Sequence, residues 1–317
     1  MGELLPWLLF SVVIVVLLLL DLLVAHRSDK ETSVREAIWW SVGWISLALV
    51  FGAGLWLWRG EVVAQQYLAA YLIEKSLSVD NLFVFVIVFS SLGIAAKYQH
   101  KVLFWGILGA IVFRLVFIFG GIALLERFHW IIYVFGAFLV LTAIKMWRTD
   151  EASGDPRRNP LVRLAERYLP IDCGYQGGAF VYRSGGKIVF TGLALALIAV
   201  ESADLVFAVD SVPAVLAISS DPFIVFTSNV FAILGLRSLY FALAGCMNRF
   251  HYLHYGLAIV LGFVGAKMLL VDVVHIPIPL SIAVILGTVG SSMGYSVWKT
   301  RNGCAPLTES AADGEDA

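Results

Sequence analysis

Residues 199–215 read AVESADLVFAVDSVPAV and place three carboxylates, Glu201, Asp204 and Asp210, in an otherwise apolar run. The flanking residues, TGLALALI before and LAIS after, extend this run far enough to cross a lipid bilayer. An acid at the centre of a membrane helix costs about 2.5–3.5 kcal/mol on an insertion scale, so an acid kept in such a segment indicates function by default. The sequence therefore predicts a membrane helix that carries a functional polar site.

The composition is typical of a helical membrane protein. Of the 317 residues, 60% are hydrophobic and only 14% are charged, whereas about a quarter of the residues in a soluble domain are charged. The net charge of −1 and the lack of a basic tract give no sign of nucleic-acid binding. Cys173, Cys246 and Cys304 form no CxxC pair, so we expect neither a disulfide framework nor a thiolate metal site.

Nine apolar stretches have about the 20 residues that a helix needs to cross the membrane. They cover residues 4–25, 38–58, 66–92, 102–124, 129–148, 191–218, 223–246, 252–272 and 277–298. Fifteen Lys and Arg residues lie in alternate connections and two in the others, which predicts an outside N-terminus and a cytoplasmic C-terminus. The predicted fold class is an all-α polytopic membrane protein of about nine transmembrane helices.

These spans divide the chain into four predicted regions. Residues 1–148 form a first membrane region with spans 1–5, and residues 191–298 form a second with spans 6–9. A cytoplasmic loop over 149–190 joins them, and the acidic tail 299–317 is expected to be disordered.

The loop contains two predicted elements. Asn159-Pro160 is typical of a helix start and opens a short amphipathic helix, LVRLAERYL. This helix would either lie on the inner membrane face or pack as an ordinary surface helix. The stretch AFVYRSGGKIVF predicts a hairpin that turns at Ser184-Gly185-Gly186.

Short motifs recur in the two membrane regions. SVDN at 78–81 matches AVDS at 208–211, and further matches follow in the same order. These are Glu74 with Asp204 (or with Glu201), Arg114 with Arg237, and Lys145 with Lys267. The repeat units cover about 66–148 and 191–272. Because spans 3 and 6 cross in opposite directions, the units are predicted to be inverted, which is typical of secondary transporters with a site near the midplane.

Polar side chains inside the predicted spans form the candidate site. The acids are Glu74, Asp80, Glu201, Asp204 and Asp210, and the bases are Lys75, Arg114, Lys145, Arg237 and Lys267. Oxygen donors on the same spans are Asn81, Asn229, Ser76, Ser78, Ser202 and Ser211. Such a set suits Mn, Mg or Ca rather than copper or zinc. Structural ion pairs remain an alternative role for Arg114, Lys145 and Lys267.

Other residue patterns exclude several functions. All six histidines lie at or beyond the ends of the predicted spans, which argues against a zinc or copper path built from histidine. The chain has no HExxH or Walker sequence, so we expect neither an enzyme nor a bound organic cofactor.

The spacing of the acids in span 6 requires a change in the helix if they share one site. Asp204 and Asp210 lie about 240° apart around a regular helix and cannot face the same point. Pro213 cannot donate to the carbonyl of Val209 and disfavours helix at the preceding residue. We therefore predict that span 6 is broken near Asp210 and exposes carbonyl oxygens there.

Three segments resemble hallmark sequences of the TerC family, membrane proteins named for tellurite resistance. They are EKSLSVDNLFVF, VESADLVFAVDSVPAVLAIS and DPFIVFTSNVFAILGLRSLYF, and the likeness extends over the whole chain. The resemblance implies a place in the LysE-type transporter superfamily and, for Alx-like members, manganese export. The matching motif positions are Glu74, Asp80, Asn81, Glu201, Asp204, Asp210, Asn229 and Arg237. Relatives are also connected with calcium and with metal supply to exported proteins.

We therefore expect a multi-pass protein of the bacterial inner membrane that exports divalent cations, with manganese as substrate and protons as candidate counter-ions. Asp80 and Asp210 are the expected prime ligands. The remaining expected ligands are Glu74, Asn81, Glu201, Asp204, Ser211 and Asn229, and the expected counter-charges are Arg237, Arg114 and Lys75. A second hypothesis is a non-transporting scaffold for membrane or secretory protein partners, and a third is an amino-acid or proton-coupled exporter.

Overall fold

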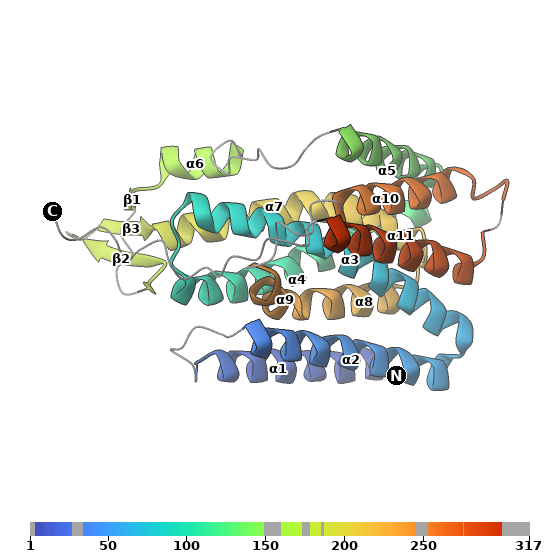
Figure 1. Cartoon of the computed structure of the whole chain (residues 1–317), viewed down its shortest axis with the longest axis horizontal. Coiled ribbons are helices and arrows are strands. Elements are labelled where there is room, and N and C mark those ends of the chain that lie inside the picture. Colours follow the sequence, from blue (N-terminus) through green and yellow to red (C-terminus); the bar gives the residue numbers. More distant parts are fainter. Residues whose placement is uncertain are drawn as a thin grey trace.

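The computed structural model describes residues 4–26, 34–148, 160–172, 178–184, 187–244, 253–274 and 276–299. Long helices run along the long axis of the molecule, and three short strands lie beyond one end of them (Figure 1). The first five helices are α1 (Leu4–His26), α2 (Val34–Arg59), α3 (Glu61–Ser91), α4 (Ala96–Arg127) and α5 (Ile131–Arg148). The others are α6 (Pro160–Tyr168), α7 (Gly192–Leu216), α8 (Pro222–Leu234), α9 (Leu236–Leu243), α10 (Leu253–Leu269) and α11 (Ile278–Lys299).

The helices coincide with the predicted apolar stretches. Each stretch corresponds to one described helix, except the seventh, which is divided between α8 and α9. Within the described ranges, six segments are long and apolar enough to cross a membrane: Val34–Arg59, Ala96–Arg127, Ile131–Arg148, Gly192–Leu216, Pro222–Leu243 and Ile278–Ser296. The prediction of an all-α polytopic membrane protein is confirmed, whereas the count of nine spans and their orientation remain predictions.

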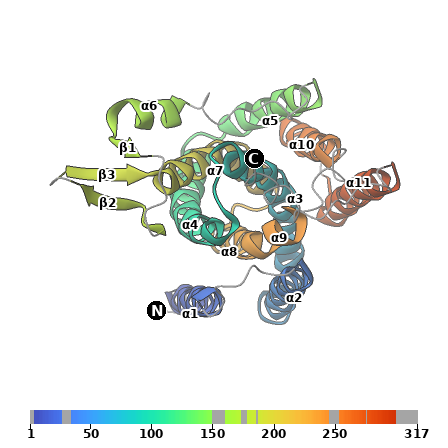
Figure 2. The same ribbon diagram turned by 60° about the vertical axis from the view of Figure 1, so that its left-hand side comes forward.

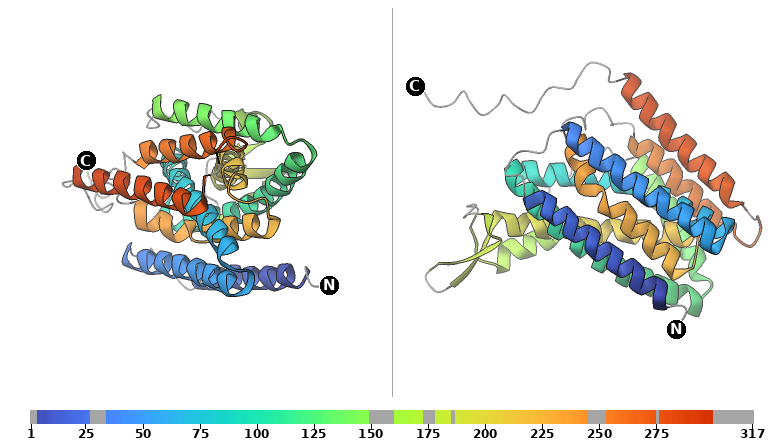
Figure 3. Two further views of the ribbon diagram at one scale, coloured as in Figure 1. Left: turned by 90° about the vertical axis from the view of Figure 1, so that its right-hand side faces the viewer. Right: turned by 90° about the horizontal axis from the view of Figure 1, so that it is seen from below.

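Four helices form the centre of the bundle. In Figure 2, α3, α4, α7 and α8 surround the middle, with α1 and α2 on one side and α5, α10 and α11 on another. The two views of Figure 3 show α1 and α11 at the outside of this arrangement. Helix α4 packs along α7, α8 packs along α3, and α5 packs along α10. In the predicted repeat, α3 corresponds to α7, α4 to α8 and α5 to α10. A two-fold axis that exchanges these counterparts would turn the α4–α7 contact into the α8–α3 contact and the α5–α10 contact into itself.

Helices α5 and α10 approach closely at two glycines. A Cβ on Gly265 would lie 2.8 Å from the carbonyl oxygen of Gly136, and a Cβ on Gly136 would lie 3.0 Å from that of Gly265. Small residues allow membrane helices to pack backbone against backbone. The absence of a side chain at both positions therefore sets the distance between α5 and α10.

Helix α7 is continuous, so the predicted break near Asp210 is wrong. Pro213 lies in the last turn of α7, where the N–H of Ala217 still donates to the Pro213 carbonyl at 3.0 Å. A proline so close to a helix end removes one hydrogen bond, to the carbonyl of Val209, without ending the helix earlier. The break among the central helices instead occurs at Gly235, between α8 and α9.

A small sheet occupies the connection between the membrane regions. Strands β1 (Ile171–Asp172), β2 (Val181–Ser184) and β3 (Lys187–Thr191) have the order β1-β3-β2, and β2 pairs with β3 in antiparallel register where the sequence predicts a hairpin. Lys101 of α4 donates a hydrogen bond to the carbonyl of Gly178 at 2.8 Å, which attaches the sheet region to the helices. Asn159, the three cysteines and the predicted tail after Lys299 lie outside the described residues.

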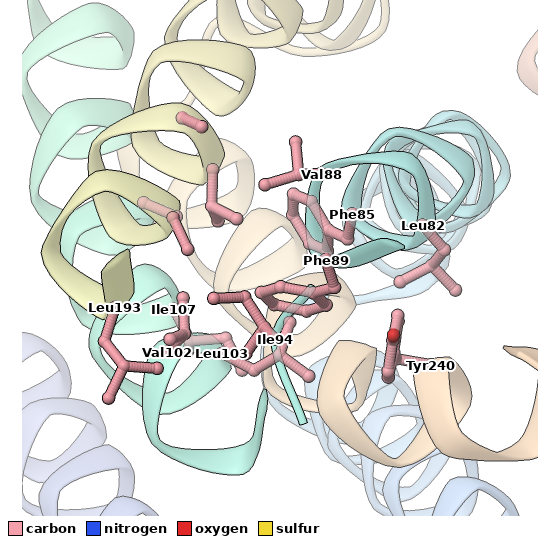
Figure 4. Packing of buried hydrophobic residues seen from close by; sticks show 14 of the residues in the cluster. Leu82, Phe85, Val88, Phe89, Ile94, Val102, Leu103, Ile107, Leu193 and Tyr240 are labelled. Atoms are coloured by element: carbon pink, nitrogen blue, oxygen red, sulfur yellow. The ribbon is translucent and has the colours of Figure 1, made fainter. Parts of the chain in front are cut away.

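An apolar cluster fills the end of the bundle nearest the strands (Figure 4). We call it the apolar plug; its labelled members are Leu82, Phe85, Val88, Phe89, Ile94, Val102, Leu103, Ile107, Leu193 and Tyr240. The rings of Phe89 and Tyr240 meet edge to face, with centroids 5.6 Å apart. The plug joins α3, α4, α7 and α9, so it closes the central helices at that end.

Candidate functional site

Arg114 of α4 lies at the centre of a polar network and is only 1% exposed. Its guanidinium donates to the carboxylate of Glu74 on α3 and to that of Asp204 on α7, the latter at 3.4 Å. It also donates to Ser211 Oγ on α7 at 3.2 Å and to Asn229 Oδ1 on α8 at 3.3 Å. We call these five residues the Arg114 network. It brings together four of the helices that the sequence assigns to the two repeat units.

Helix α3 contributes a polar stripe to this centre. Glu74, Ser78 and Asn81 are spaced by four and three residues, so they share one helix face. Their exposed fractions are 0%, 0% and 1%, respectively. Ser76, which the sequence also suggests as a donor, instead donates to the carbonyl of Leu72 in its own helix at 2.6 Å.

Two carboxylate oxygens of the Arg114 network, and two further oxygens on the same face of α3, are buried and lack a hydrogen-bond partner among the described residues. They are Glu74 Oε1, Ser78 Oγ, Asn81 Oδ1 and Asp204 Oδ2. Buried polar atoms in folded proteins almost always have a partner, so a group of four requires an explanation. Carboxylate, amide and hydroxyl oxygens are the donors that bind hard divalent cations such as Mn, Mg and Ca.

The described residues contain no group of three or more His, Cys, Asp or Glu side chains placed to hold a metal ion. The centre has two paired carboxylates, Glu74 and Asp204, and the remaining unpartnered oxygens belong to Ser78 and Asn81. Asp80 lies on α3, but its side chain is outside the description. The residues of this centre that could bind a cation are therefore the two carboxylates, with the hydroxyl of Ser78 and the amide of Asn81 on the same face of α3.

Glu201 lies on α7 one turn before Asp204 and packs against α4. A Cβ on Gly109 would overlap the Glu201 carboxylate, so the glycine provides the space for this acid. Glu201 Oε2 is buried without a hydrogen-bond partner among the described residues. Ser202, by contrast, donates to the carbonyl of Ala199 at 2.9 Å in the same helix. Glu201 therefore borders the centre, and the Ser202 hydroxyl bonds within its own helix.

Asp210 lies apart from the Arg114 network. It is half-buried and accepts a hydrogen bond from Thr142 Oγ1 of α5 at 3.2 Å. Because α7 is continuous through both acids, Asp204 and Asp210 face different neighbouring helices. The structure therefore does not bring Asp210 together with Glu74 and Asp204 into one shell of ligands.

The remaining bases have separate positions. Lys75 donates to the carbonyl of Ala232 at 3.2 Å, near the end of α8. Arg237 is buried on α9 and, with Asp204, borders a narrow cavity otherwise lined by apolar side chains and Gly106. Lys267 donates to Ser281 Oγ of α11 at 3.2 Å. Among the described bases, Arg114 thus bonds to Asp204 directly, and Arg237 lines the same cavity as this acid.

Sequence reasoning missed three features of the site. Thr142 was not expected as a partner of Asp210, although it is a hydroxyl residue three positions before Lys145 in the same predicted span. Nothing in the sequence marks Gly109 as important, because its role is to leave room for Glu201 on the neighbouring helix α7. Gly235, within LGLR, could have been recognised as a helix interruption.

The fold and the buried charges define a polytopic helical membrane protein with a polar centre. The model for "Integral membrane protein TerC family" matches residues 59–303, and the chain therefore belongs to this family. A Myxococcus xanthus protein, "Uncharacterized membrane protein STKORF319", is 48% identical over 306 residues, covering 96% of this chain and 95% of the relative.

Other relatives are also similar over nearly their full length. "Putative membrane-bound redox modulator Alx" of Escherichia coli strain K12 is 43% identical over 306 residues, covering 94% of this chain and 95% of the relative. "Uncharacterized membrane protein" of Rickettsia felis is 39% identical over 280 residues, covering 88% and 93%. No solved structure matches the chain at a significant level.

Proposed function

We propose that this chain is a secondary transporter that moves divalent cations, with manganese as the first candidate substrate, across the bacterial inner membrane. The observation that carries this proposal is that Arg114 pairs with two buried carboxylates, Glu74 and Asp204, whose second oxygens have no hydrogen-bond partner among the described residues. Ser78 and Asn81, on the same face of α3 as Glu74, carry two further unpartnered oxygens. A hard divalent cation would satisfy such oxygens. Charged groups inside a membrane are costly and mark ion pathways in transporters.

When no cation is bound, Arg114 would take its place and compensate the charge of the two acids. Two buried carboxylates without a counter-charge are strongly unfavourable, and Arg114 pairs with both Glu74 and Asp204. A divalent cation that binds these carboxylates would displace the guanidinium toward Ser211 and Asn229, its other partners. When the cation leaves, Arg114 would return. The guanidinium in the empty centre and the cation in the loaded one would each compensate Glu74 and Asp204, and protonation of the acids could do the same with protons as counter-ions.

Access to the centre would require movement of the apolar plug. The plug closes the central helices at the end nearest the strands, and the cavity beside Asp204 and Arg237 lies among its residues. In secondary transporters, movement of one repeat unit against the other exposes a central site to each side in turn. Arg237 would offer Asp204 a second counter-charge along this route.

The test is manganese flux into proteoliposomes that contain the purified full chain, with and without a pH gradient. Glu74→Gln removes one charge from the Arg114 network, and we expect it to abolish flux. Glu61→Gln is the matched control on α3, because Glu61 is exposed and accepts from Gln65 within its own helix, at 2.9 Å. Wild-type protein that is folded yet moves no manganese under either gradient would overturn the proposal. Competition by Mg and Ca in the same assay measures selectivity.

A scaffold remains the second candidate, because the Arg114 network also joins α3, α4, α7 and α8 as structural ion pairs would. The charge exchange Glu74→Arg with Arg114→Glu separates the two readings when Asp204→Asn is added, because Asp204 would otherwise face a like charge at position 114. A scaffold keeps its fold and its partners after this exchange, since the ion pair is retained. A cation site loses its flux, since an arginine then replaces the ligand carboxylate on α3.

A further inference from the structure

A groove lies on the outer surface of the bundle between α5 and α10. Its volume is about 360 Å³, within the 300–1,000 Å³ typical of small-molecule sites. Small and aliphatic side chains line it, among them Ala143, Ile144, Ala258, Ile259 and Gly262. Ile144 and Ile259 are 43% and 46% exposed, so the groove is open along its side.

The groove follows from the way in which the two helices cross. They touch at Gly136 and Gly265. Beyond this contact, the small residues Ala143, Ala258 and Gly262 lie along the groove. A Cβ on Gly262 would lie 3.6 Å from the Cβ of Ala143, which is an ordinary contact distance. No larger side chain would fit between the two helices at this point, whereas the groove beside it is open. A channel therefore remains along α5 from Val140 to the end of the helix.

The dimensions and the charge of the groove match one leaflet of a bilayer. The eight-residue step from Val140 to Arg148 corresponds to about 12 Å of helix, close to half of the roughly 30 Å hydrocarbon core. Arg148 is the one charged side chain among the described residues that line the groove. Beside it, Trp147 packs edge to face against Tyr255, with centroids 5.2 Å apart, and such aromatic residues are enriched at the membrane interface.

We propose that this groove binds one acyl chain of an anionic phospholipid whose phosphate pairs with Arg148. The apolar walls accept the chain, and the exposed guanidinium at the end of α5 lies at the depth of the headgroup. The sequence predicts that this end of α5 faces the cytoplasm, where anionic lipids attract basic residues. Thr142, next to Ala143 on α5, donates to Asp210, so a bound lipid would also hold α5 in position against α7.

The test uses the full chain in phosphatidylcholine vesicles that contain brominated phosphatidylglycerol or brominated phosphatidylcholine as the minor lipid. Brominated chains quench nearby tryptophan, and the contribution of Trp147 is the difference between wild type and Trp147→Phe. We expect Trp147 to prefer the glycerol lipid about fivefold, the ratio that about 1 kcal/mol per basic residue gives. Trp56, 60% exposed on α2, should show no preference when it is measured in the same way with Trp56→Phe.

Two substitutions complete the test. Arg148→Gln should remove the preference at Trp147, whereas Arg127→Gln, at the exposed end of α4, should leave it unchanged. Gly262→Leu should remove quenching by both lipids, provided that circular dichroism shows an intact fold; otherwise Arg148→Gln decides alone. Equal quenching by the two lipids, a preference that survives Arg148→Gln, or no quenching of Trp147 by either lipid would overturn the proposal. These readouts are independent of transport.

Discussion

Lys75 of α3 donates a hydrogen bond to the backbone carbonyl of Ala232, 3.2 Å from its Nζ, in the last turn of α8. The last carbonyls of a helix have no partner within the helix, and a cation at this end also interacts favourably with the helix dipole. A Cβ on Gly235, at the junction with α9, would lie 3.0 Å from the same Nζ. The ammonium group thus stabilises the point at which the predicted seventh span is interrupted.

Replacing this lysine should destabilise the interruption. Lys75→Met leaves the Ala232 carbonyl buried without a donor, and we expect the free energy of unfolding to fall by about 1–3 kcal/mol. Lys75→Arg should retain most of the stability, since it keeps a charged donor. The measurement is unfolding of the detergent-solubilised chain, with Lys97→Met, exposed near the start of α4, as control. A Lys75→Met variant as stable as this control would contradict the prediction.

Arg114 should be the most sensitive position of the polar centre. Arg114→Gln leaves Glu74 and Asp204 buried without a cation, and removing one partner of a buried ion pair costs about 3–5 kcal/mol. The double change Arg114→Gln with Glu74→Gln should recover part of this loss, because it also removes one of the uncompensated carboxylates. The same unfolding experiment measures both variants.

The control for Arg114 lies on the same helix. Arg127→Gln changes an exposed side chain at the end of α4, so its effect should remain within about 0.5 kcal/mol. A double variant less stable than Arg114→Gln alone would show that Glu74 is held by groups other than Arg114.

The membrane helices could be predicted because length and hydropathy are local properties of the chain. The separate directions of Asp204 and Asp210 could also be predicted, since they depend only on the number of residues per helical turn. The break was assigned to the wrong helix because the effect of a proline depends on its distance from the helix end. Pro213 lies within one turn of that end, whereas Gly235 divides a single predicted span into α8 and α9.

The members of the polar centre could be named from the sequence, but their pairing could not. Glu74, Arg114 and Asp204 were all recognised as charged groups inside spans. Which base meets which acid depends on the distances between helices, and these are set by packing elsewhere. Gly109 illustrates this, because its contact with Glu201 exists only when α4 and α7 lie side by side.

Gly109 should therefore accept a side chain only if Glu201 moves. A Cβ there would overlap the carboxylate of Glu201, so Gly109→Ala must displace this acid or separate α4 from α7. The carboxylate is the end of a flexible side chain and can move aside, so stability should fall by less than the about 1–3 kcal/mol of rigid overpacking, and we expect the larger effect on manganese flux. Gly120→Ala is the control on α4, because no atom lies within 4 Å of its added Cβ. It should leave stability unchanged or raise it by about 0.5–1 kcal/mol, since alanine favours a helix over glycine.

Gly265 tests the contact between α5 and α10 in the same way. Gly265→Ala would place a Cβ 2.8 Å from the carbonyl oxygen of Gly136, and a backbone atom cannot move aside as a flexible side chain can. We expect the free energy of unfolding to fall by about 1–3 kcal/mol. Gly262→Ala lies one turn earlier on α10, and its Cβ would lie at an ordinary contact distance of 3.6 Å from Ala143. If both variants unfold alike, the two glycines do not set the helix distance, and the groove beside them would need another explanation.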